Sequence, residues 1–254
     1  MKRVQDFKFK DYKWLNYQNY ILTLKTSDSI AEIKPGNFAE LKIPNAPDVF
    51  LRRPLSILDV DHVKNTISFY VKIIGKGTEK LGKLRGGDKV SVIYPLGNSF
   101  SVNGTKKALL VGGGSGIAPF ILLGRELKQK GIDITFLIGA RTKEDVLLTD
   151  EFKKLGEVLV TTEDGTMGQT GLVTHHSVFT EAFLFDKIYT CGPDPMMKAI
   201  AKIAEEKGVD CEASLENMMA CGFGACLCCV VETNGGNKCV CTEGPVFNTK
   251  ELAW

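Results

Sequence analysis

The pattern of apolar and polar residues along the chain changes near residue 102. Before this point, short runs rich in β-branched and aromatic residues are separated by turn-forming dipeptides such as Pro35-Gly36 and Pro44-Asn45. Such runs are typical of β-strands, and several short strands in close succession predict a small antiparallel barrel. The expected strands cover residues 17–24, 37–43, 54–60, 66–74 and 88–94.

Beyond residue 102, short apolar runs alternate with segments of helical periodicity. We expect strands at 108–111, 132–138, 158–161, 187–190 and 210–212, helices at 120–130 and 199–208, and one helical turn at 214–219. This alternation predicts a parallel, doubly wound sheet. The expected fold class is therefore multidomain β plus α/β, with an antiparallel barrel in residues 1–101, an α/β domain in 102–210 and a small C-terminal domain in 211–254.

Composition narrows the class of protein. With 44% hydrophobic and 24% charged residues among 254, the chain is typical of globular proteins. Its 32 basic and 30 acidic side chains leave a net charge of +2, which argues against a nucleic-acid partner. No apolar run approaches the length of a membrane span, and the first residues carry no apolar targeting segment, so we expect a cytoplasmic protein without a membrane span.

Six of the eight cysteines lie between Cys221 and Cys241. Cys221, Cys226 and Cys229 follow the spacing C-x4-C-x2-C and Cys241 comes later, which is the plant-type arrangement for a [2Fe–2S] cluster. The glycines that flank Phe223 supply the backbone freedom that a loop needs to turn its amides toward sulfur. We therefore predict that these four thiolates bind the metal.

Three other interpretations of these thiols compete with the cluster. Zinc also binds four thiolates, but its usual sites pair two C-x2-C units, and only Cys226 and Cys229 form one cleanly here. Disulfides need an oxidising compartment, for which nothing at the amino terminus argues, and buried structural thiols are the third alternative. Cys228 and Cys239 fall outside the spacing and are interpreted as non-ligands.

Two segments of the predicted barrel carry groups that bind a diphosphate and an aromatic ring. Arg53 and Ser56 place a guanidinium and a hydroxyl on one strand. Tyr70 begins a stretch that runs into a glycine-rich turn and a short helix capped by Thr78, whose free amides form an anion site. Each segment alone is also typical of plain barrel structure, but together they predict a flavin dinucleotide. The expected contact residues are Arg53, Pro54, Leu55, Ser56, Tyr70, Val71, Lys72, Gly77 and Thr78.

Two turns of the predicted α/β domain follow strands and open helices. Ligands of such sheets bind outside the carboxyl ends of the strands, with phosphate at a helix N-terminus. The glycine-rich turn at 112–119 departs from strict G-x-G-x-x-G, yet it stands after the first strand, where a dinucleotide binds. A capped turn with a buried thiol is the alternative for the second. The expected nicotinamide contacts are Gly112, Gly113, Gly114, Gly116, Cys191, Gly192 and Pro193.

The acidic residues after the third strand of this domain bear on the choice of dinucleotide. Glu163 and Asp164 follow that strand, and a carboxylate there binds the free ribose hydroxyl of NAD, whereas NADP requires a basic side chain. Arg141 after the second strand points the other way. We expect NAD.

Taken in order, these segments resemble a known superfamily. Arg53-Pro-Leu-Ser56, the Gly77-Thr78 turn, the glycine turn at 112–119 and the turn from Cys191 to Met197 are similar to those of the ferredoxin–NADP reductase superfamily over the first 210 residues. With the cysteine loop and the sequence after Cys241, the whole chain resembles the electron-transfer subunits of type B dihydroorotate dehydrogenase.

This resemblance implies a function, cofactors and a partner. The chain would be a relay without an acid–base catalyst, passing electrons from an FMN-containing dihydroorotate dehydrogenase catalytic subunit through [2Fe–2S] and FAD to NAD⁺ in pyrimidine biosynthesis. Two copies of each subunit would form a heterotetramer. The small subunits of NADH-dependent ferredoxin:NADP oxidoreductase and sulfide dehydrogenase are also similar, but typically carry aspartate at the position of Cys221. A stand-alone NADH:acceptor reductase and a non-enzymatic metal-binding module are the alternatives from other classes.

Overall fold

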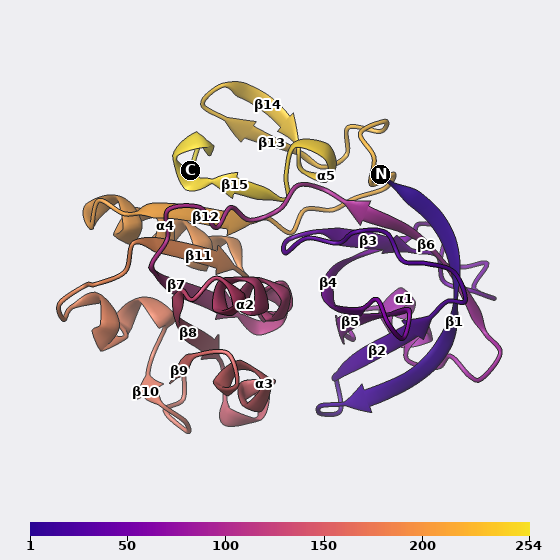
Figure 1. Ribbon diagram of the computed structural model, residues 1–254, viewed down its shortest axis with the longest axis horizontal. Helices are drawn as coiled ribbons and strands as arrows, with labels where there is room; N and C mark the ends of the chain where they lie inside the picture. The colour runs from indigo at the N-terminus through magenta and orange to yellow at the C-terminus, as the bar shows by residue number, and fades with distance from the viewer.

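The computed structural model describes residues 1–254 and consists of a barrel, an α/β sheet and a C-terminal segment that lies against both (Figure 1). The barrel closes in the antiparallel order β1-β2-β5-β4-β3-β6. Its buried side chains, such as Phe7, Tyr20 and Phe69, fill the interior. The strands are β1 (Arg3–Trp14), β2 (Asn19–Lys25), β3 (Phe38–Leu41), β4 (Arg53–Asp61), β5 (Thr66–Lys72) and β6 (Lys89–Leu96), and α1 (Lys76–Leu81) follows β5.

The barrel confirms the predicted class and corrects one detail. Strand β1 was not predicted. Phe7 is the single fully buried residue among its 12, and its charged residues mask the alternation of apolar and polar positions. Thr78 caps the short helix from the N3 position of a capping box, while the N-cap itself is Gly75. Thr78 lies within the first turn, where its hydroxyl accepts hydrogen bonds from the N–H groups of Ile74 and Gly75 at 3.0 and 3.3 Å.

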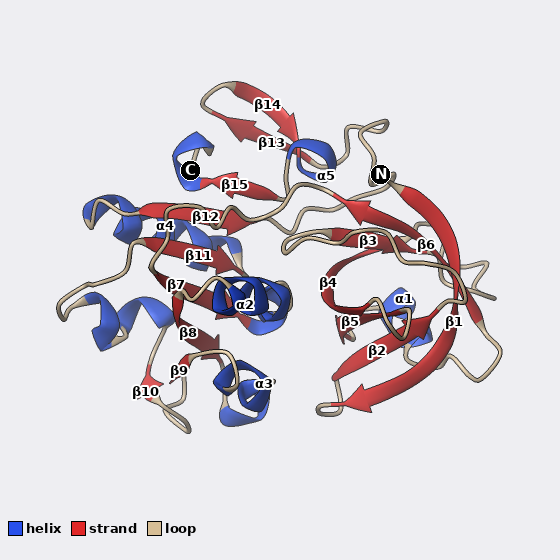
Figure 2. Ribbon diagram, in the orientation of Figure 1, coloured by secondary structure: helices blue, strands red, loops and turns tan.

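The sheet has seven strands in the order β10-β9-β8-β7-β11-β12-β15. From β9 to β12 the strands are parallel and doubly wound, as predicted. Ala108 and Leu110 pack with α2 on one face, and Leu109 and Val111 pack with α4 on the other. The elements, which Figure 2 separates by type, are β7 (Lys107–Gly113), α2 (Phe120–Gln129), β8 (Asp133–Ala140), α3 (Thr149–Lys153), β9 (Glu157–Thr162), β10 (Gln169–Thr170), β11 (Lys187–Cys191), α4 (Asp194–Glu206) and β12 (Asp210–Ser214).

The C-terminal segment holds β13 (Val230–Thr233), β14 (Gly236–Cys239), α5 (Val240–Glu243) and β15 (Val246–Asn248). Strand β15 pairs antiparallel with β12, so this segment extends the sheet. The helical turn expected at 214–219 was wrong, because Ser214 ends β12 and the following residues form an irregular loop. No helix in the structure combines the length and apolar character needed to span a bilayer.

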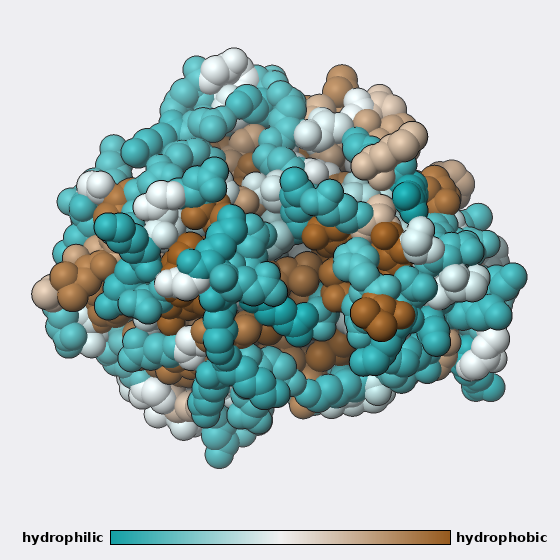
Figure 3. All heavy atoms as spheres, in the orientation of Figure 1, coloured by the Kyte–Doolittle hydropathy of each residue, from teal (hydrophilic) through white to brown (hydrophobic).

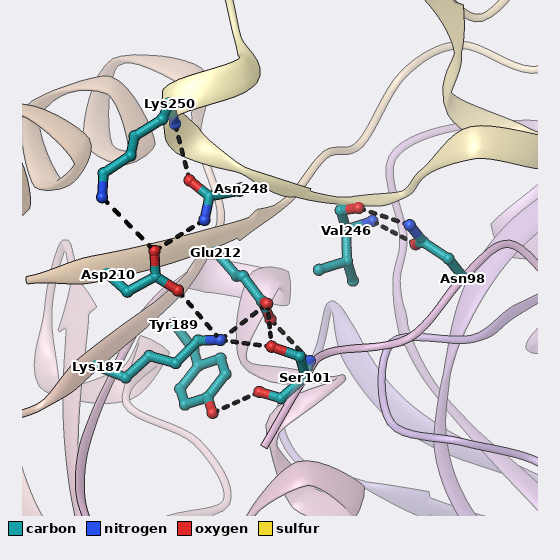
Figure 4. Close-up of polar contacts among 9 residues, drawn as sticks. All are labelled: Asn98, Ser101, Lys187, Tyr189, Asp210, Glu212, Val246, Asn248 and Lys250. Atoms are coloured by element: carbon teal, nitrogen blue, oxygen red, sulfur yellow. Dashed lines mark hydrogen bonds and ion pairs between the residues drawn. The ribbon is translucent and has the colours of Figure 1, made fainter. Parts of the chain in front are cut away.

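A buried polar joint holds the linker between the barrel and the sheet (Figure 4). Lys187 of β11 donates to Ser101 Oγ at 2.6 Å and to Glu212 Oε1 at 2.8 Å, and the Ser101 N–H donates to Glu212 Oε2 at 2.9 Å. Beside it, the Asn98 side chain exchanges hydrogen bonds with both backbone groups of Val246. The joint therefore ties together all three parts of the chain.

Candidate functional site

The cysteine loop lies between β12 and β13 and turns its backbone amides toward sulfur. Gly222 and Gly224 have φ values of 72° and 91°, in the left-handed region that glycine reaches without strain. The N–H groups of Phe223 and Ala225 donate to Cys221 Sγ at 3.5 and 3.3 Å. Burial raises the pKa of Cys221, but hydrogen bonds from Phe223, Cys226 and Ala225 outweigh it and lower the pKa to about 6. A thiolate, the form that binds metal, is favoured there.

The four predicted ligands form two pairs. Cys221 and Cys226 are joined by a side-chain hydrogen bond, and the N–H of Cys241 donates to Cys229 Sγ at 3.4 Å. Nowhere do three or more His, Cys, Asp or Glu side chains converge in a way that suits a single ion. Two pairs of thiolates fit a binuclear cluster, in which each iron takes two protein ligands, better than one tetrahedral zinc.

The adjacent thiols Cys228 and Cys229 differ in burial, although the predicted ligands as a group do not, since Cys221 is half-exposed and Cys226 is exposed. Cys229 and Cys241 are buried, whereas Cys228 is exposed and its Sγ lies 3.7 Å from the carbonyl oxygen of Met218. Cys239 is half-exposed. All eight cysteines are free, so the disulfide interpretation finds no pair in this structure. The assignment of Cys229 as ligand stays a prediction, with its buried position in support.

A buried carboxyl group separates the cysteine loop from the barrel, and sequence reasoning missed it. Glu40 of β3 is fully buried, and neither carboxyl oxygen has a hydrogen-bond partner. A Cβ on Gly222 would lie 2.6 Å from Glu40 Cγ, so the loop packs directly on this side chain. Burial raises the pKa of Glu40 to about 7, against the opposing charge of Arg52. The only signal in the sequence was a charged residue within an otherwise apolar strand.

The predicted flavin residues lie where two barrel strands separate. Pairing between β4 and β5 stops at Ile57 and Phe69, so 53–56 and 70–72 do not bond to each other. Their polar groups on that side are free for a cofactor, as a bound dinucleotide requires. Val71 points into the barrel core, so only its backbone is available.

The structure brings Arg53 into contact with Gly77, in the first turn of α1. A Cβ on Gly77 would lie 2.4 Å from Arg53 Nε, so a side chain at this position would displace the guanidinium. The same guanidinium donates to the backbone oxygens of Leu51 and Arg52 at 2.8 and 3.1 Å. A guanidinium beside free amides is the chemistry that binds a diphosphate. These residues therefore fit the flavin dinucleotide that the sequence predicted.

A cavity of about 380 Å³ lies between β5 and the carboxyl ends of the sheet strands. Of the predicted contacts, Tyr70, Lys72, Gly113, Gly114 and Pro193 line it. The cavity lies where a dinucleotide binds in a doubly wound sheet. Further lining residues not predicted as contacts are Asn19, Asp145, Thr161, Thr174 and Met196.

The remaining predicted nicotinamide residues pack the turns together behind this cavity. A Cβ on Gly116 would lie 2.3 Å from the backbone oxygen of Cys191, and one on Gly112 would lie 2.7 Å from Ile117. Cys191 is fully buried, and burial raises the pKa of its thiol well above the usual range. These residues do not line the cavity, so their expected contact with the cofactor stays a prediction.

Polar groups at the far side of the cavity suit a ribose. The Thr161 hydroxyl is buried without a hydrogen-bond partner, and Thr161 lines the cavity. Glu163 and Arg141 line it as well, so both groups that bear on the dinucleotide choice reach the same space. An unpartnered buried hydroxyl is costly unless a ligand satisfies it, which favours a hydroxyl-rich ligand here.

A flavin-type opening in a barrel, a cavity at the switch point of a doubly wound sheet and a loop of paired thiols define a reductase of the ferredoxin–NADP reductase type. The solved NADH-dependent reduced ferredoxin-NADP oxidoreductase is similar, with a TM-score of 0.89, 31% identity and coverage of 98% of this chain and 90% of that one. The ferredoxin reductase of carbazole 1,9a-dioxygenase shares the fold, with a TM-score of 0.70, 23% identity and coverage of 82% and 67%.

Sequence relatives place the chain more narrowly. The dihydroorotate dehydrogenase B (NAD(+)) electron transfer subunit of Clostridium acetobutylicum is 40% identical over 222 residues, 87% of each chain, and that of Fusobacterium nucleatum is 38% identical over 226 residues, 86% of each. Residues 216–253 match the iron-sulfur cluster binding domain of dihydroorotate dehydrogenase B, and residues 110–202 match the oxidoreductase NAD-binding domain. The chain belongs to the family of dihydroorotate dehydrogenase B electron transfer subunits, which confirms the predicted resemblance.

Proposed function

We propose that this chain passes electrons from a catalytic subunit that oxidises dihydroorotate to NAD⁺, through a [2Fe–2S] cluster and FAD, in pyrimidine biosynthesis. When bound, the cluster carries one electron at a time, the flavin one or two, and the nicotinamide two as hydride. The observation that carries the proposal is the spatial order of the sites. The cysteine loop packs on Glu40 of the barrel, and the cavity is walled by β5 of the same barrel.

This order gives each predicted residue a role. Cys221 and Cys226 would hold one iron, and Cys229 and Cys241 the other, in a domain that we assign to residues 211–254. Arg53 and the Gly77 turn would hold the flavin diphosphate within residues 1–101. The α/β domain, 102–210, would orient the nicotinamide across the cavity toward the barrel.

We propose NAD as the dinucleotide on the basis of charge at the cavity wall. Glu163 lines the cavity, where its carboxylate can accept a hydrogen bond from a ribose 2′-hydroxyl and repels a 2′-phosphate. Arg141 lines the same cavity and can bind the diphosphate common to both dinucleotides. Substitution of Glu163 by Gln would then narrow the preference for NADH over NADPH.

The partner proposed is an FMN-containing catalytic subunit, two copies of which would join two of this chain in the cytoplasm. A barrel for that chemistry needs about 250 residues, for which none of the three parts of this fold has room. Met218, Phe223 and Leu227 of the cysteine loop are 86%, 51% and 64% exposed. The space-filling view shows apolar colour gathered over this loop, and we propose it as the surface that meets the catalytic subunit (Figure 3).

Anaerobic purification and reconstitution test the proposal. The expected protein shows flavin bands and thiolate-to-iron charge-transfer absorption, and NADH bleaches the flavin. Addition of the catalytic subunit should then give dihydroorotate-dependent reduction of NAD⁺. A colourless protein that holds zinc would overturn the proposal.

A second function is favoured by the 31% identity and TM-score of 0.89 to the NADH-dependent reduced ferredoxin-NADP oxidoreductase. In that case the chain would exchange electrons between NADH and a ferredoxin. Ferredoxin reduction by the single chain, with no dihydroorotate-dependent activity after the catalytic subunit is added, would favour this alternative.

A further inference from the structure

A series of side-chain hydrogen bonds crosses from the barrel to the nicotinamide domain beside the cavity. The Tyr70 hydroxyl donates to Asn19 Oδ1 at 2.6 Å. Asn19 Nδ2 donates to Asn16 Oδ1 at 2.8 Å, and Asn16 Nδ2 donates to the backbone oxygen of Glu144 at 3.1 Å. Tyr70 and Asn19, at the start of the series, both line the cavity. The series therefore connects one wall of the cavity with the opposite domain.

Asn16 is held in one orientation by its own turn. Its Oδ1 also accepts hydrogen bonds from the N–H groups of Gln18 and Asn19, at 3.0 and 2.9 Å. This is the arrangement by which an asparagine side chain stabilises a turn. Because the oxygen is committed to the β1–β2 turn, the amide nitrogen is presented to the other domain, where it meets Glu144.

Glu144 belongs to the segment after β8 that forms the opposite wall of the cavity. Arg141 and Asp145, on either side of it, both line the cavity. Within its own domain this segment has two braces, from Lys143 N to Thr166 Oγ1 at 2.9 Å and from Asp164 N to the Arg141 oxygen at 3.2 Å. The hydrogen bond from Asn16 to Glu144 holds the same segment from the barrel side.

The other polar contacts between the two domains are the buried joint at Ser101, which lies away from the cavity, and two exposed ion pairs. Lys13 meets Glu151 at 2.7 Å, and Arg125 meets Asp59, with side chains between 33% and 60% exposed. Exposed pairs of this kind contribute little and weaken further in salt. None of these four residues lines the cavity. Asn16, by contrast, bonds to the segment whose residues Arg141 and Asp145 line the cavity.

We propose that Asn16 is a positioning residue, whose carboxamide holds segment 141–145 against the barrel so that Arg141 and Asp145 keep the geometry that binds the nicotinamide dinucleotide. This inference rests on the proposed function, because it takes that dinucleotide as the ligand of the cavity. The segment contacts the ligand throughout the reaction, so its loosening should raise KM for NADH and leave kcat unchanged.

Two variants isolate the bond to Glu144. Asn16→Ser keeps an oxygen that accepts the turn N–H groups but is too short to reach Glu144. Asn16→Asp keeps the Oδ1 acceptor and replaces the donor nitrogen with a second acceptor. Asn65→Asp is the matched control for charge, because Asn65 lies in the β4–β5 turn, at the opposite end of β5 from the cavity.

The experiment measures NADH dissociation constants by calorimetry on the flavin- and cluster-loaded protein, reduced beforehand with dithionite so that binding occurs without electron transfer. Hydrogen exchange of segment 141–145 is measured on the same protein. Both Asn16 variants should bind NADH about two- to tenfold more weakly, the range that one neutral hydrogen bond is worth, and should exchange this segment faster. Asn65→Asp should match the wild type in both measurements.

Three results would overturn the inference. The first is wild-type affinity for NADH in Asn16→Ser. The second is weaker binding in Asn16→Asp alone, which would mark a charge effect. The third is a lower melting temperature with unchanged affinity, which would mark a purely structural role. Failure of the wild-type protein itself to bind NADH would count against the proposed function and is distinguishable from all three.

Discussion

Removal of the negative charge from the buried joint should destabilise the protein strongly. The side chains of Lys187 and Glu212 are 6% and 10% exposed, and Lys187 Nζ lies 2.8 Å from Glu212 Oε1. Glu212→Gln preserves the shape of the side chain but removes its charge. The buried Lys187 ammonium then has one carboxylate left, that of Asp210, which lies 3.4 Å away and is 42% exposed. Loss of one partner of a buried pair costs about 3–5 kcal/mol, and we expect about 3 because Asp210 remains.

The measurement compares guanidinium-chloride unfolding of this variant with that of a matched exposed pair. Lys238 and Glu251 lie 2.7 Å apart with side chains 32% and 48% exposed, so Glu251→Gln should cost at most about 1 kcal/mol. The double variant Lys187→Met/Glu212→Leu, which removes both buried charges, should recover part of the loss. Equal costs for Glu212→Gln and Glu251→Gln would refute the view that burial gives the joint its strength.

Three further predictions test other parts of the structure. Cys229→Ser should abolish the iron–sulfur absorption and Cys228→Ser should keep it, with the reverse pattern contradicting the ligand assignment. Burial lowers the pKa of His176 below 6.5, and its Nδ1 accepts a backbone N–H; the unfolded state therefore binds more protons, and stability should fall as the pH drops below about 6.5. His176→Asn should flatten this dependence in thermal melts, and parallel curves would argue against it. Gly116→Ala places a Cβ 2.3 Å from a backbone oxygen and should impair NADH binding and stability, whereas Gly86→Ala, with open space around it, should do neither.

Much of the architecture could be predicted because it depends on local patterns. Strands of the barrel and sheet have runs of apolar residues whose period reports burial, so the fold class followed from the chain alone. Strand β1 escaped because its outward residues are charged and it has a single fully buried anchor, Phe7. Strand β15 was not predicted because it has three residues and forms by pairing with β12, which is distant in sequence.

The sequence by itself determined which chemical groups the protein carries: the thiols at cluster spacing, the guanidinium and hydroxyl on one strand, and the strand-to-helix turns of a dinucleotide domain. Spacing suffices for these because the residues of each group are close together in the chain, where covalent geometry limits the distances. Tertiary structure alone decided which groups meet across the chain, such as Glu40 with Gly222, Arg53 with Gly77, and Asn16 with Glu144. Such contacts depend on how separate elements pack against each other, and the hydrophobic periodicity of one element does not say which residue of another element it will meet.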